Sequence, residues 1–195
     1  FYWNEEFAPI MKAGGFDIAI GNPPYVDIYT IPEEDRRYFT KSEDYPTAYK
    51  KSDLYVLFIE RSLSLLKEGG MISFIIPDKF KFAPYAEKLR KHILETCMVN
   101  TIADFGSLKV FPKSTVRNII FVLTKTSDKE ARDSNFVEAL SVSQIHPEMQ
   151  WKAERMPQNL FLKQPEFEFR LQLFDALTRQ LVAKIEKGTR PLEEI

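Results

Sequence analysis

Cysteine and histidine are scarce in this sequence. Cys97 is the single cysteine, and the two histidines, His92 and His146, lie far apart in a chain of 195 residues. One thiol cannot form an intrachain disulfide, and a zinc site needs several thiolate or imidazole ligands that converge. The composition therefore excludes a disulfide framework, predicts no metal site, and is typical of a reducing, cytoplasmic setting.

An excess of charge of one sign is also missing. Lysine and arginine number 27 against 28 aspartate and glutamate, which gives a formal net charge of -1. A globally basic nucleic-acid-binding chain is excluded, so any surface for phosphates has to be local. No apolar run approaches the roughly 20 residues of a membrane-spanning helix, and residues 1–7 lack the basic start of a signal peptide. Because the first residue is Phe1 rather than methionine, we expect a piece of a longer protein.

The sequence contains 44% hydrophobic residues, which is enough for a hydrophobic core. Their spacing predicts strands that alternate with helices. Strands are expected at residues 16–21, 71–76, 101–105 and 118–124, and helices at residues 52–66 and 84–94. This order predicts an α/β fold with an open, mostly parallel, Rossmann-like sheet. The last two strands have no room for a crossover helix between them, so the final strand is expected to be antiparallel.

The character of the chain changes after Lys125. A polar linker at residues 126–135 precedes an expected strand at 136–142 and a long amphipathic helix at 165–187. We therefore divide the chain into a catalytic part, residues 1–126, and a linker with the mixed or helical start of a further domain, residues 127–195. For the first helix, Asp53 or the serine before it is the expected N-cap and Gly69 the expected C′ residue.

The informative tetrapeptide is Asn22-Pro23-Pro24-Tyr25, which follows the first expected strand. Ligand and reaction sites of open α/β sheets lie at the carboxyl ends of strands. The Asn22 side-chain oxygen and the Pro23 carbonyl are two fixed acceptors for the N–H groups of a planar amine, because consecutive prolines offer no competing donor and little freedom. Tyr25 offers a flat face to a base extruded from a duplex. A proline-stiffened turn with a solvent tyrosine is the structural alternative.

Residues 16–25, FDIAIGNPPY, resemble motif IV of the gamma-type adenine-N6 DNA methyltransferases, and in particular the methylase part of large fused type II restriction-modification enzymes. Residues 53–58 resemble motif V and residues 106–112 resemble motif VIII. The resemblance implies a Rossmann-like class I methyltransferase sheet, S-adenosylmethionine as cofactor, double-stranded DNA as partner and a bacterial or archaeal source. It leaves open whether an endonuclease domain or subunit accompanies the methylase.

The resemblance also assigns roles to individual residues. Asn22, Pro23, Pro24 and Tyr25 correspond to the catalytic motif, and Tyr25 and Phe111 to the two aromatic faces that sandwich the flipped base. Phe58 corresponds to the phenylalanine that packs on the adenine of the cofactor, and Gly21 lies at the same cofactor edge. For both Phe58 and Phe111, a place in the hydrophobic core is the alternative interpretation.

Basic residues gather locally, with nine against four acidic residues between positions 78 and 125. Four of them fall on expected loops beside the motif and are candidates for binding phosphates: Lys79, Lys109, Lys113 and Arg117. A solvated protein surface is the alternative interpretation of the same charges.

The glycine-rich cofactor loop of the family precedes motif IV, and here only Gly14-Gly15 comes before it. We therefore predict that the isolated fragment binds S-adenosylmethionine weakly and is inactive. Two rival functions stay open at this point. One is a methyltransferase that acts on guanine amines of RNA or on glutamine side chains of proteins. The other is a non-catalytic module that docks on DNA.

Overall fold

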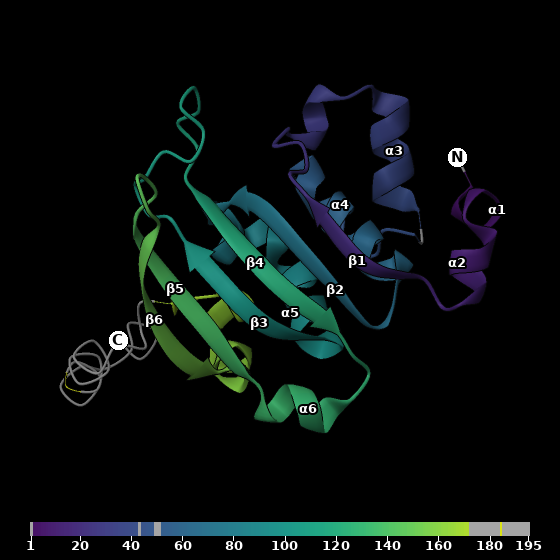
Figure 1. Ribbon diagram of the computed structural model, residues 1–195. Coiled ribbons are helices and arrows are strands. Elements are labelled where there is room, and N and C mark those ends of the chain that lie inside the picture. The colour runs from purple at the N-terminus through teal and green to yellow at the C-terminus, as the bar shows by residue number, and fades with distance from the viewer. Residues whose placement is uncertain (1, 43, 49–51, 172–183, 185–195) are drawn as a thin grey trace, which may run out of the picture.

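The computed structural model describes residues 2–42, 44–48, 52–171 and 184. Six strands form one mixed sheet in the order β1-β2-β4-β3-β5-β6 (Figure 1). Their bounds are β1 Phe16–Gly21, β2 Leu66–Pro77, β3 Cys97–Asp104, β4 Asn118–Lys125, β5 Phe136–Gln144 and β6 Gln150–Pro157. β1 is parallel to β2, whereas β4 is antiparallel to both of its neighbours, β2 and β3. The expected Rossmann-like α/β sheet with an antiparallel return is confirmed.

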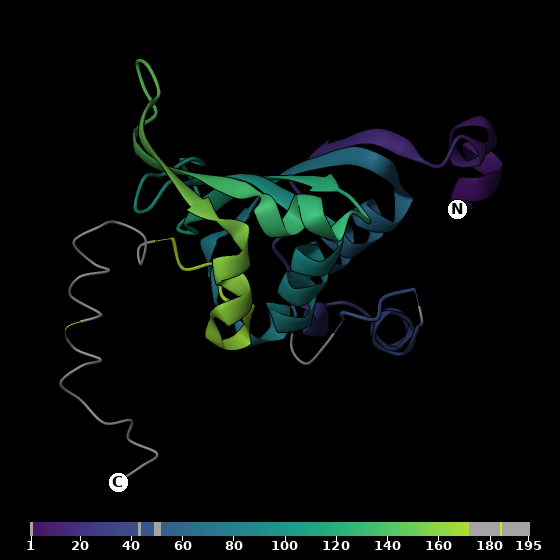
Figure 2. The ribbon, with the colours of Figure 1, turned by 90° about the horizontal axis from the view of Figure 1, so that it is seen from below.

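The α-helices are α1 Trp3–Glu6, α2 Ala8–Lys12, α3 Glu33–Lys41, α4 Leu54–Leu65, α5 Glu87–Thr96 and α6 Lys129–Ser134. Helices α4 and α5 pack on one face of this sheet, below it in Figure 2, whereas α1 and α2 lie beside the edge strand β1. Short 3-10 turns are η1 Ile28–Thr30, η2 Asp78–Lys81, η3 Pro84–Ala86, η4 Gln158–Lys163 and η5 Pro165–Phe167. None of the helices in the described ranges has the length and apolarity that crossing a membrane requires.

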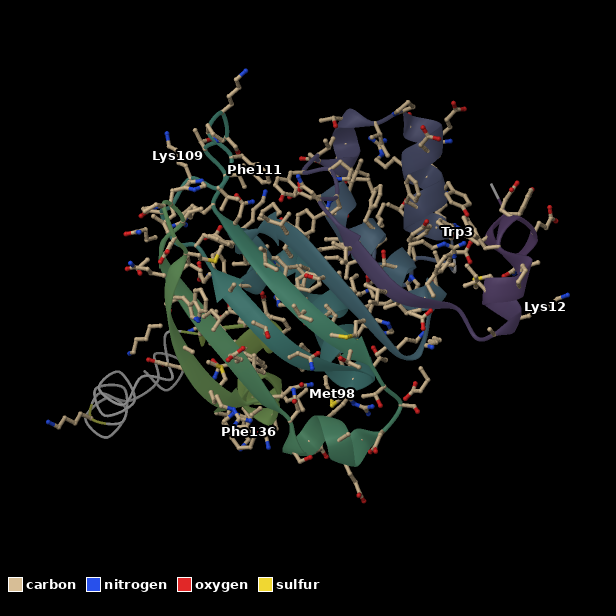
Figure 3. All side chains as sticks on the ribbon, in the orientation of Figure 1. Trp3, Lys12, Met98, Lys109, Phe111 and Phe136 are labelled. Atoms are coloured by element: carbon tan, nitrogen blue, oxygen red, sulfur yellow. The ribbon has the colours of Figure 1, made fainter. Side chains whose placement is uncertain are left out.

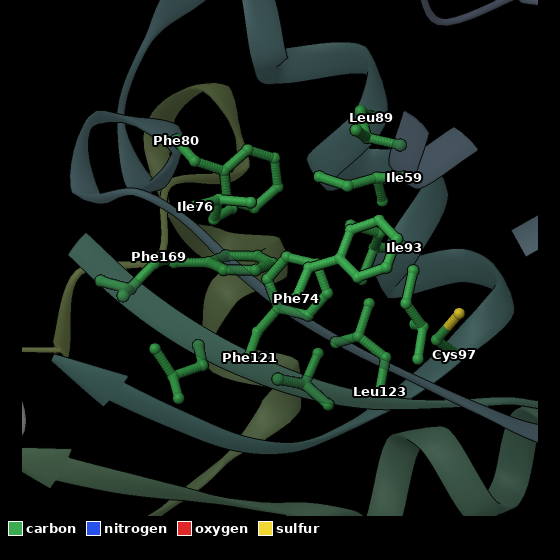
Figure 4. Close-up of a cluster of buried hydrophobic side chains, with 14 of the residues drawn as sticks. Ile59, Phe74, Ile76, Phe80, Leu89, Ile93, Cys97, Phe121, Leu123 and Phe169 are labelled. Atoms are coloured by element: carbon green, nitrogen blue, oxygen red, sulfur yellow. The ribbon is translucent and has the colours of Figure 1, made fainter. Parts of the chain in front are cut away.

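The core lies between this face of the sheet and helices α4 and α5 (Figure 4). Alternate residues of β2 point into it, and Phe74 packs against Phe121 of β4 with their ring centroids 6.3 Å apart. Ile59 of α4 and Ile93 of α5 are fully buried opposite them. Each such side chain contributes about 1.5–3 kcal/mol through burial. The packing therefore fixes both helices, and with them the loops at the carboxyl ends of β1 and β2.

The end of α4 differs from the sequence prediction. Gly69 is not the C′ residue of this helix, because α4 ends at Leu65 and β2 begins at Leu66, which pairs with Phe16. The ladder then shifts register, so that Ile18 pairs with Met71. Gly69 lies in this bulge with φ +75, a conformation that disfavours side chains. Gly69 therefore allows the bulge in β2 and does not end α4.

The C-terminal segment was also predicted incorrectly. Strand β6 was not expected, and it extends the sheet as the antiparallel partner of β5. The long helix predicted from residue 165 is wrong over 165–170, where the turn η5 is followed by non-helical residues. The reason is tertiary: Phe169 leaves the helical path to pack on Phe80 and Phe161 in the core. Residues 172–183 and 185–187 of that prediction lie outside the described residues.

Candidate active site

The Asn22-Pro23-Pro24-Tyr25 loop leaves the carboxyl end of β1, as the sequence predicted. Asn22 is exposed, whereas Pro23 is buried and anchors the loop. The chain that follows is tied to the start of α4: the Leu54 N–H donates to the Val26 carbonyl at 2.7 Å. Together with the bond from the Ile28 N–H to the Ser52 carbonyl at 2.9 Å, this hydrogen bond ties the segment after the loop to the start of α4, where the sequence resembles motif V.

Tyr25 is held by its hydroxyl group. The hydroxyl donates to the carbonyl oxygen of Ile75 at 2.9 Å and accepts from Nδ2 of Asn118 at 3.3 Å. Its half-buried ring meets Tyr55 edge to face, with centroids 6.4 Å apart. Burial raises the pKa of Tyr25 to about 12, against the opposing effect of the Asn118 hydrogen bond. The ring therefore has a fixed orientation, and its hydroxyl stays protonated at neutral pH.

A polar network that the sequence analysis missed lies beneath this loop. Asp53 occupies the N-cap position of α4, as expected, but its side chain makes no capping bond. Instead its carboxylate lies 2.9 Å from the Lys79 ammonium and accepts from the Tyr85 hydroxyl at 3.0 Å. The Tyr85 hydroxyl is in turn 2.9 Å from that of Tyr55. Asp53 and Tyr55 fall in the segment that resembles motif V, and Lys79 was a candidate phosphate contact. No sequence pattern marks Tyr85 or predicts that these side chains meet.

Phe111 lies on the loop between β3 and β4, residues 105–117, and is half-buried. Figure 3 shows Phe111 and Lys109 on this loop, which projects from the same end of the sheet as the carboxyl end of β1. The base of the loop is closed by the Phe105 N–H, which donates to the Asn118 carbonyl at 3.3 Å. The fold thus brings the loops of Tyr25 and Phe111 to one edge, as the base-sandwich prediction requires.

Phe58 does not lie in the core, which was the alternative interpretation of this residue. Its side chain is 48% exposed on α4, although Leu57 and Ile59 on either side are buried. Ser62 lies one turn further on the same helix face and lines a cavity of about 200 Å³ together with Ile18 of β1. Phe58 thus presents a partly exposed apolar ring on α4. Its predicted packing on the adenine of the cofactor stays a prediction.

Gly21 has a packing role at the end of β1. A Cβ atom added there would lie 3.2 Å from the ring of Phe74. A side chain at this position would therefore require the Phe74 ring to shift by a few tenths of an ångström. The predicted contact of Gly21 with the cofactor stays a prediction.

The four candidate phosphate contacts fall into two groups. Lys79 pairs with Asp53, and Arg117 pairs with Asp78 at 3.2 Å between Nε and Oδ2. Lys109 and Lys113 are exposed, and within the described ranges no carboxylate lies within ion-pairing distance of either. Of the four candidates, Lys109 and Lys113 are therefore more available to an external phosphate than Lys79 and Arg117, which already pair with carboxylates.

In the part of the chain that the structure describes, no three histidine, cysteine, aspartate or glutamate side chains are grouped so that they could hold a metal ion. Burial raises the pKa of the Cys97 thiol to about 11. The thiol is therefore protonated at neutral pH and is a poor metal ligand or nucleophile.

Sequence comparison finds relatives among restriction-modification enzymes. The chain is 38% identical over 114 residues to the type II restriction enzyme and methyltransferase RM.Eco57I of Escherichia coli, covering 56% of this chain and 11% of that protein. It is 36% identical over 141 residues to the type II methyltransferase M.BstVI of Geobacillus stearothermophilus, covering 71% of this chain and 24% of that protein. The chain therefore spans only a tenth to a quarter of the length of these relatives.

Structure comparison agrees on the fold. The type IIG restriction endonuclease BpuSI superposes with a TM-score of 0.59 at 17% identity, covering 94% of this chain and 23% of BpuSI. The family described as Eco57I restriction-modification methylase matches residues 1–111, which include the asparagine-proline loop, α4 and Phe111. The sequence resemblance to the methylase part of fused type II enzymes is confirmed, and the chain belongs to the Eco57I restriction-modification methylase family.

Proposed function

We propose that the parent protein transfers a methyl group from S-adenosylmethionine to the N6 amine of adenine in double-stranded DNA, and that this chain carries the loop that binds the amine. One observation carries the proposal: Asn22 and Pro23 leave the carboxyl end of a parallel strand beside a tyrosine fixed by two hydrogen bonds. Reaction sites of such sheets lie at this edge.

The adenine amine is a poor nucleophile because its lone pair is delocalised into the ring. Oδ1 of Asn22 and the carbonyl of Pro23 accept its two N–H groups and draw the lone pair out of conjugation. These acceptors are preorganised by Pro23 and Pro24, which restrict the backbone. S-adenosylmethionine, when bound, supplies the electrophilic methyl group on a sulfonium. The amine proton is lost to water, and Tyr25 is not the base because its hydroxyl carries a proton up to about pH 12.

The flipped base stacks between Tyr25 and Phe111 in this proposal. The two residues belong to loops at the same sheet edge, and the Tyr25 ring is held by Ile75 and Asn118. Stacking on aromatic rings contributes about 1–3 kcal/mol per base. This contribution offsets part of the cost of extruding the adenine from the duplex.

Residues outside the chain complete the cofactor site. Phe58 packs on the adenine of S-adenosylmethionine and Gly21 lies at the same edge, but β1 pairs only with β2 in the described part of the sheet. The glycine loop and the recognition domain belong to the remaining length of the parent protein, with residues 127–195 leading into recognition. RM.Eco57I is named as both restriction enzyme and methyltransferase. On this basis we infer that an endonuclease accompanies the methylase. Because the glycine loop of the family has no counterpart in this chain, we expect the isolated chain to be inactive.

The test is a methyl-transfer assay on the full-length parent protein with labelled S-adenosylmethionine and mixed-sequence DNA. We expect label in N6-methyladenine after digestion to nucleosides, and its loss in Asn22→Ala. The matched control is Asn100→Ala on β3, whose side chain bonds Thr124 at 2.8 Å within the sheet. Label on another nucleoside, on RNA or on protein would reject adenine-N6 transfer to DNA. DNA binding without any transfer would support a docking module instead.

A further inference from the structure

Asn118 is a polar residue in a fully buried position. Its side chain is 0% exposed at the first residue of β4, and Nδ2 donates to the Tyr25 hydroxyl at 3.3 Å. Its Oδ1 atom has no hydrogen-bond partner within the described part of the chain. A buried amide oxygen without a partner destabilises a protein, and an apolar residue of similar size would remove that cost. The amide therefore has a role other than stabilising the fold.

The backbone of Asn118 serves a second loop. Its carbonyl accepts from the Phe105 N–H at 3.3 Å and closes the base of the loop that carries Phe111. In the sheet, Asn118 pairs with Pro77 of β2. Pro77 lies two residues after Ile75, whose carbonyl accepts from the Tyr25 hydroxyl. One residue thus contacts Tyr25 through its side chain and borders the Phe111 loop through its backbone.

We propose that Asn118 is a positioning residue that sets the orientation of Tyr25 relative to Phe111, and so the slot into which the extruded base fits. This inference rests on the proposed function. Asn118 touches no reacting atom and acts through Tyr25. Without the Nδ2 donor, the Tyr25 hydroxyl keeps only its bond to Ile75, and the ring gains freedom to tilt about that single contact.

The experiment is a double-mutant cycle in the full-length enzyme with Asn118→Leu, Tyr25→Phe and both together. We expect each single variant to lower kcat for methyl transfer about tenfold, since small displacements of reacting groups have effects of this size, with KM for S-adenosylmethionine unchanged. The double variant should be no worse than the poorer single variant, because removing both partners of a hydrogen bond leaves neither unpaired.

A second readout reports on the base itself. With 2-aminopurine at the mapped target position, fluorescence of the complex should be higher in Asn118→Leu than in the wild type, because the flipped base stacks less closely on the aromatic rings. Asn100→Leu, the same substitution on the neighbouring strand, is the control and should change neither kcat nor fluorescence. Asn118→Ala, which removes the donor without adding bulk, provides the test if the leucine variant does not fold.

Multiplicative losses in the double variant would overturn the proposal, because the two side chains would then act independently. An equal loss in Asn100→Leu would overturn it as well, since the effect would be one of general sheet stability. Failure of the proposed function is distinguishable from both outcomes, because it appears as no N6-methyladenine with the unsubstituted enzyme.

Discussion

Arg90 donates two hydrogen bonds to the backbone carbonyl of Glu166, from Nη2 at 2.9 Å and from Nε at 3.3 Å, across 76 positions of the chain. Its remaining nitrogen, Nη1, bonds the carbonyls of Phe80 and Ala83. The side chain is 0% exposed, and burial lowers the pKa of the guanidinium. One buried cation thus ties the C-terminal segment to α5 and to the loop that follows β2.

We expect Arg90→Met to lower the free energy of unfolding by about 3 kcal/mol, because the carbonyls of Phe80 and Glu166 lose the guanidinium that donates to them. The Ala83 carbonyl, in contrast, keeps the Ala86 N–H. Urea unfolding followed by circular dichroism measures the change. Arg155→Met is the matched control, since Arg155 is exposed and lies over the Phe136 ring. A similar decrease in the free energy of unfolding in both variants would show that the buried hydrogen bonds of Arg90 stabilise the fold no more than an exposed arginine does.

The Lys81–Asp104 ion pair is buried, with side chains 8% and 15% exposed. Lys81→Met should destabilise the fold by about 3 kcal/mol, because it leaves a largely buried carboxylate without its cation. Asp104 also accepts from the Gly106 N–H at 2.8 Å, at the start of the Phe111 loop. Lys129→Met, which breaks an exposed pair with Asp133 on α6, should have little effect. Equal stability of the two variants in urea would contradict the prediction.

Glu60 should make stability fall as pH rises. Burial raises the pKa of its carboxyl above the ordinary 4.5, although the hydrogen bonds from Thr47 oppose this shift. The folded state therefore binds a proton more tightly than the unfolded state, and its contribution is fully present below pH 4.5. That contribution is lost as pH rises through the raised value.

Glu60→Gln removes this titration and should flatten the curve of unfolding free energy against pH over that window. The amide keeps an acceptor for the Thr47 N–H, which lies 2.8 Å from the Glu60 carboxylate. Glu138→Gln on the exposed side of β5 is the matched control for the loss of one carboxylate. A curve for Glu60→Gln that still follows the wild type would rule out Glu60 as its source.

Phe58→Ala tests the cofactor role assigned to α4. Because the ring is 48% exposed, the substitution should change stability little, yet it should raise KM for S-adenosylmethionine about tenfold in the full-length enzyme. Phe136→Ala, at a ring 49% exposed on β5, should leave that KM unchanged. An unchanged KM in Phe58→Ala would remove Phe58 from the cofactor site.

Lys109 and Lys113 should each contribute to DNA binding through phosphates. Replacing either by alanine is expected to lower the slope of log affinity against log salt by about 1, equally for all sequences. Arg117→Ala should lower it less, because Arg117 already pairs with Asp78. Equilibrium binding of the full-length protein at several salt concentrations measures the slopes. Identical slopes for Lys109→Ala and Arg117→Ala would contradict the distinction.

The sequence predicted the elements that depend on local patterns. Strand β1 is bounded by Gly15 and the double proline, and β2 ends at Pro77. These glycine and proline residues made the carboxyl ends of both parallel strands predictable from the sequence. The position of the asparagine-proline loop at the carboxyl end of β1 followed from that pattern. The exposure of Phe58 next to two buried residues was not decided by the sequence, because its spacing suits both a helix core and a cofactor surface.

Features that depend on contacts between distant residues escaped the sequence analysis. Gly69 resembles a helix cap locally, but the pairing of Leu66 with Phe16 decides its place in a bulge. Asp53 has the pattern of an N-cap, but Lys79 and Tyr85 engage its carboxylate from segments beyond β2. Asn118 belongs to no motif and is identified only through its contact with Tyr25.

The Arg90 contacts bear on where this chain can be joined to a segment of a relative without loss of stability. The Phe169 N–H donates to the Lys81 carbonyl at 2.8 Å, and the Glu166 carbonyl accepts from Arg90. Residues 165–169 are therefore hydrogen-bonded to η2 and α5. A chimera joined directly after Pro157 would replace these partners and leave the guanidinium of Arg90 facing a foreign chain. A junction placed after Leu171 keeps them, and we predict that such a chimera unfolds at a higher urea concentration than one joined after Pro157.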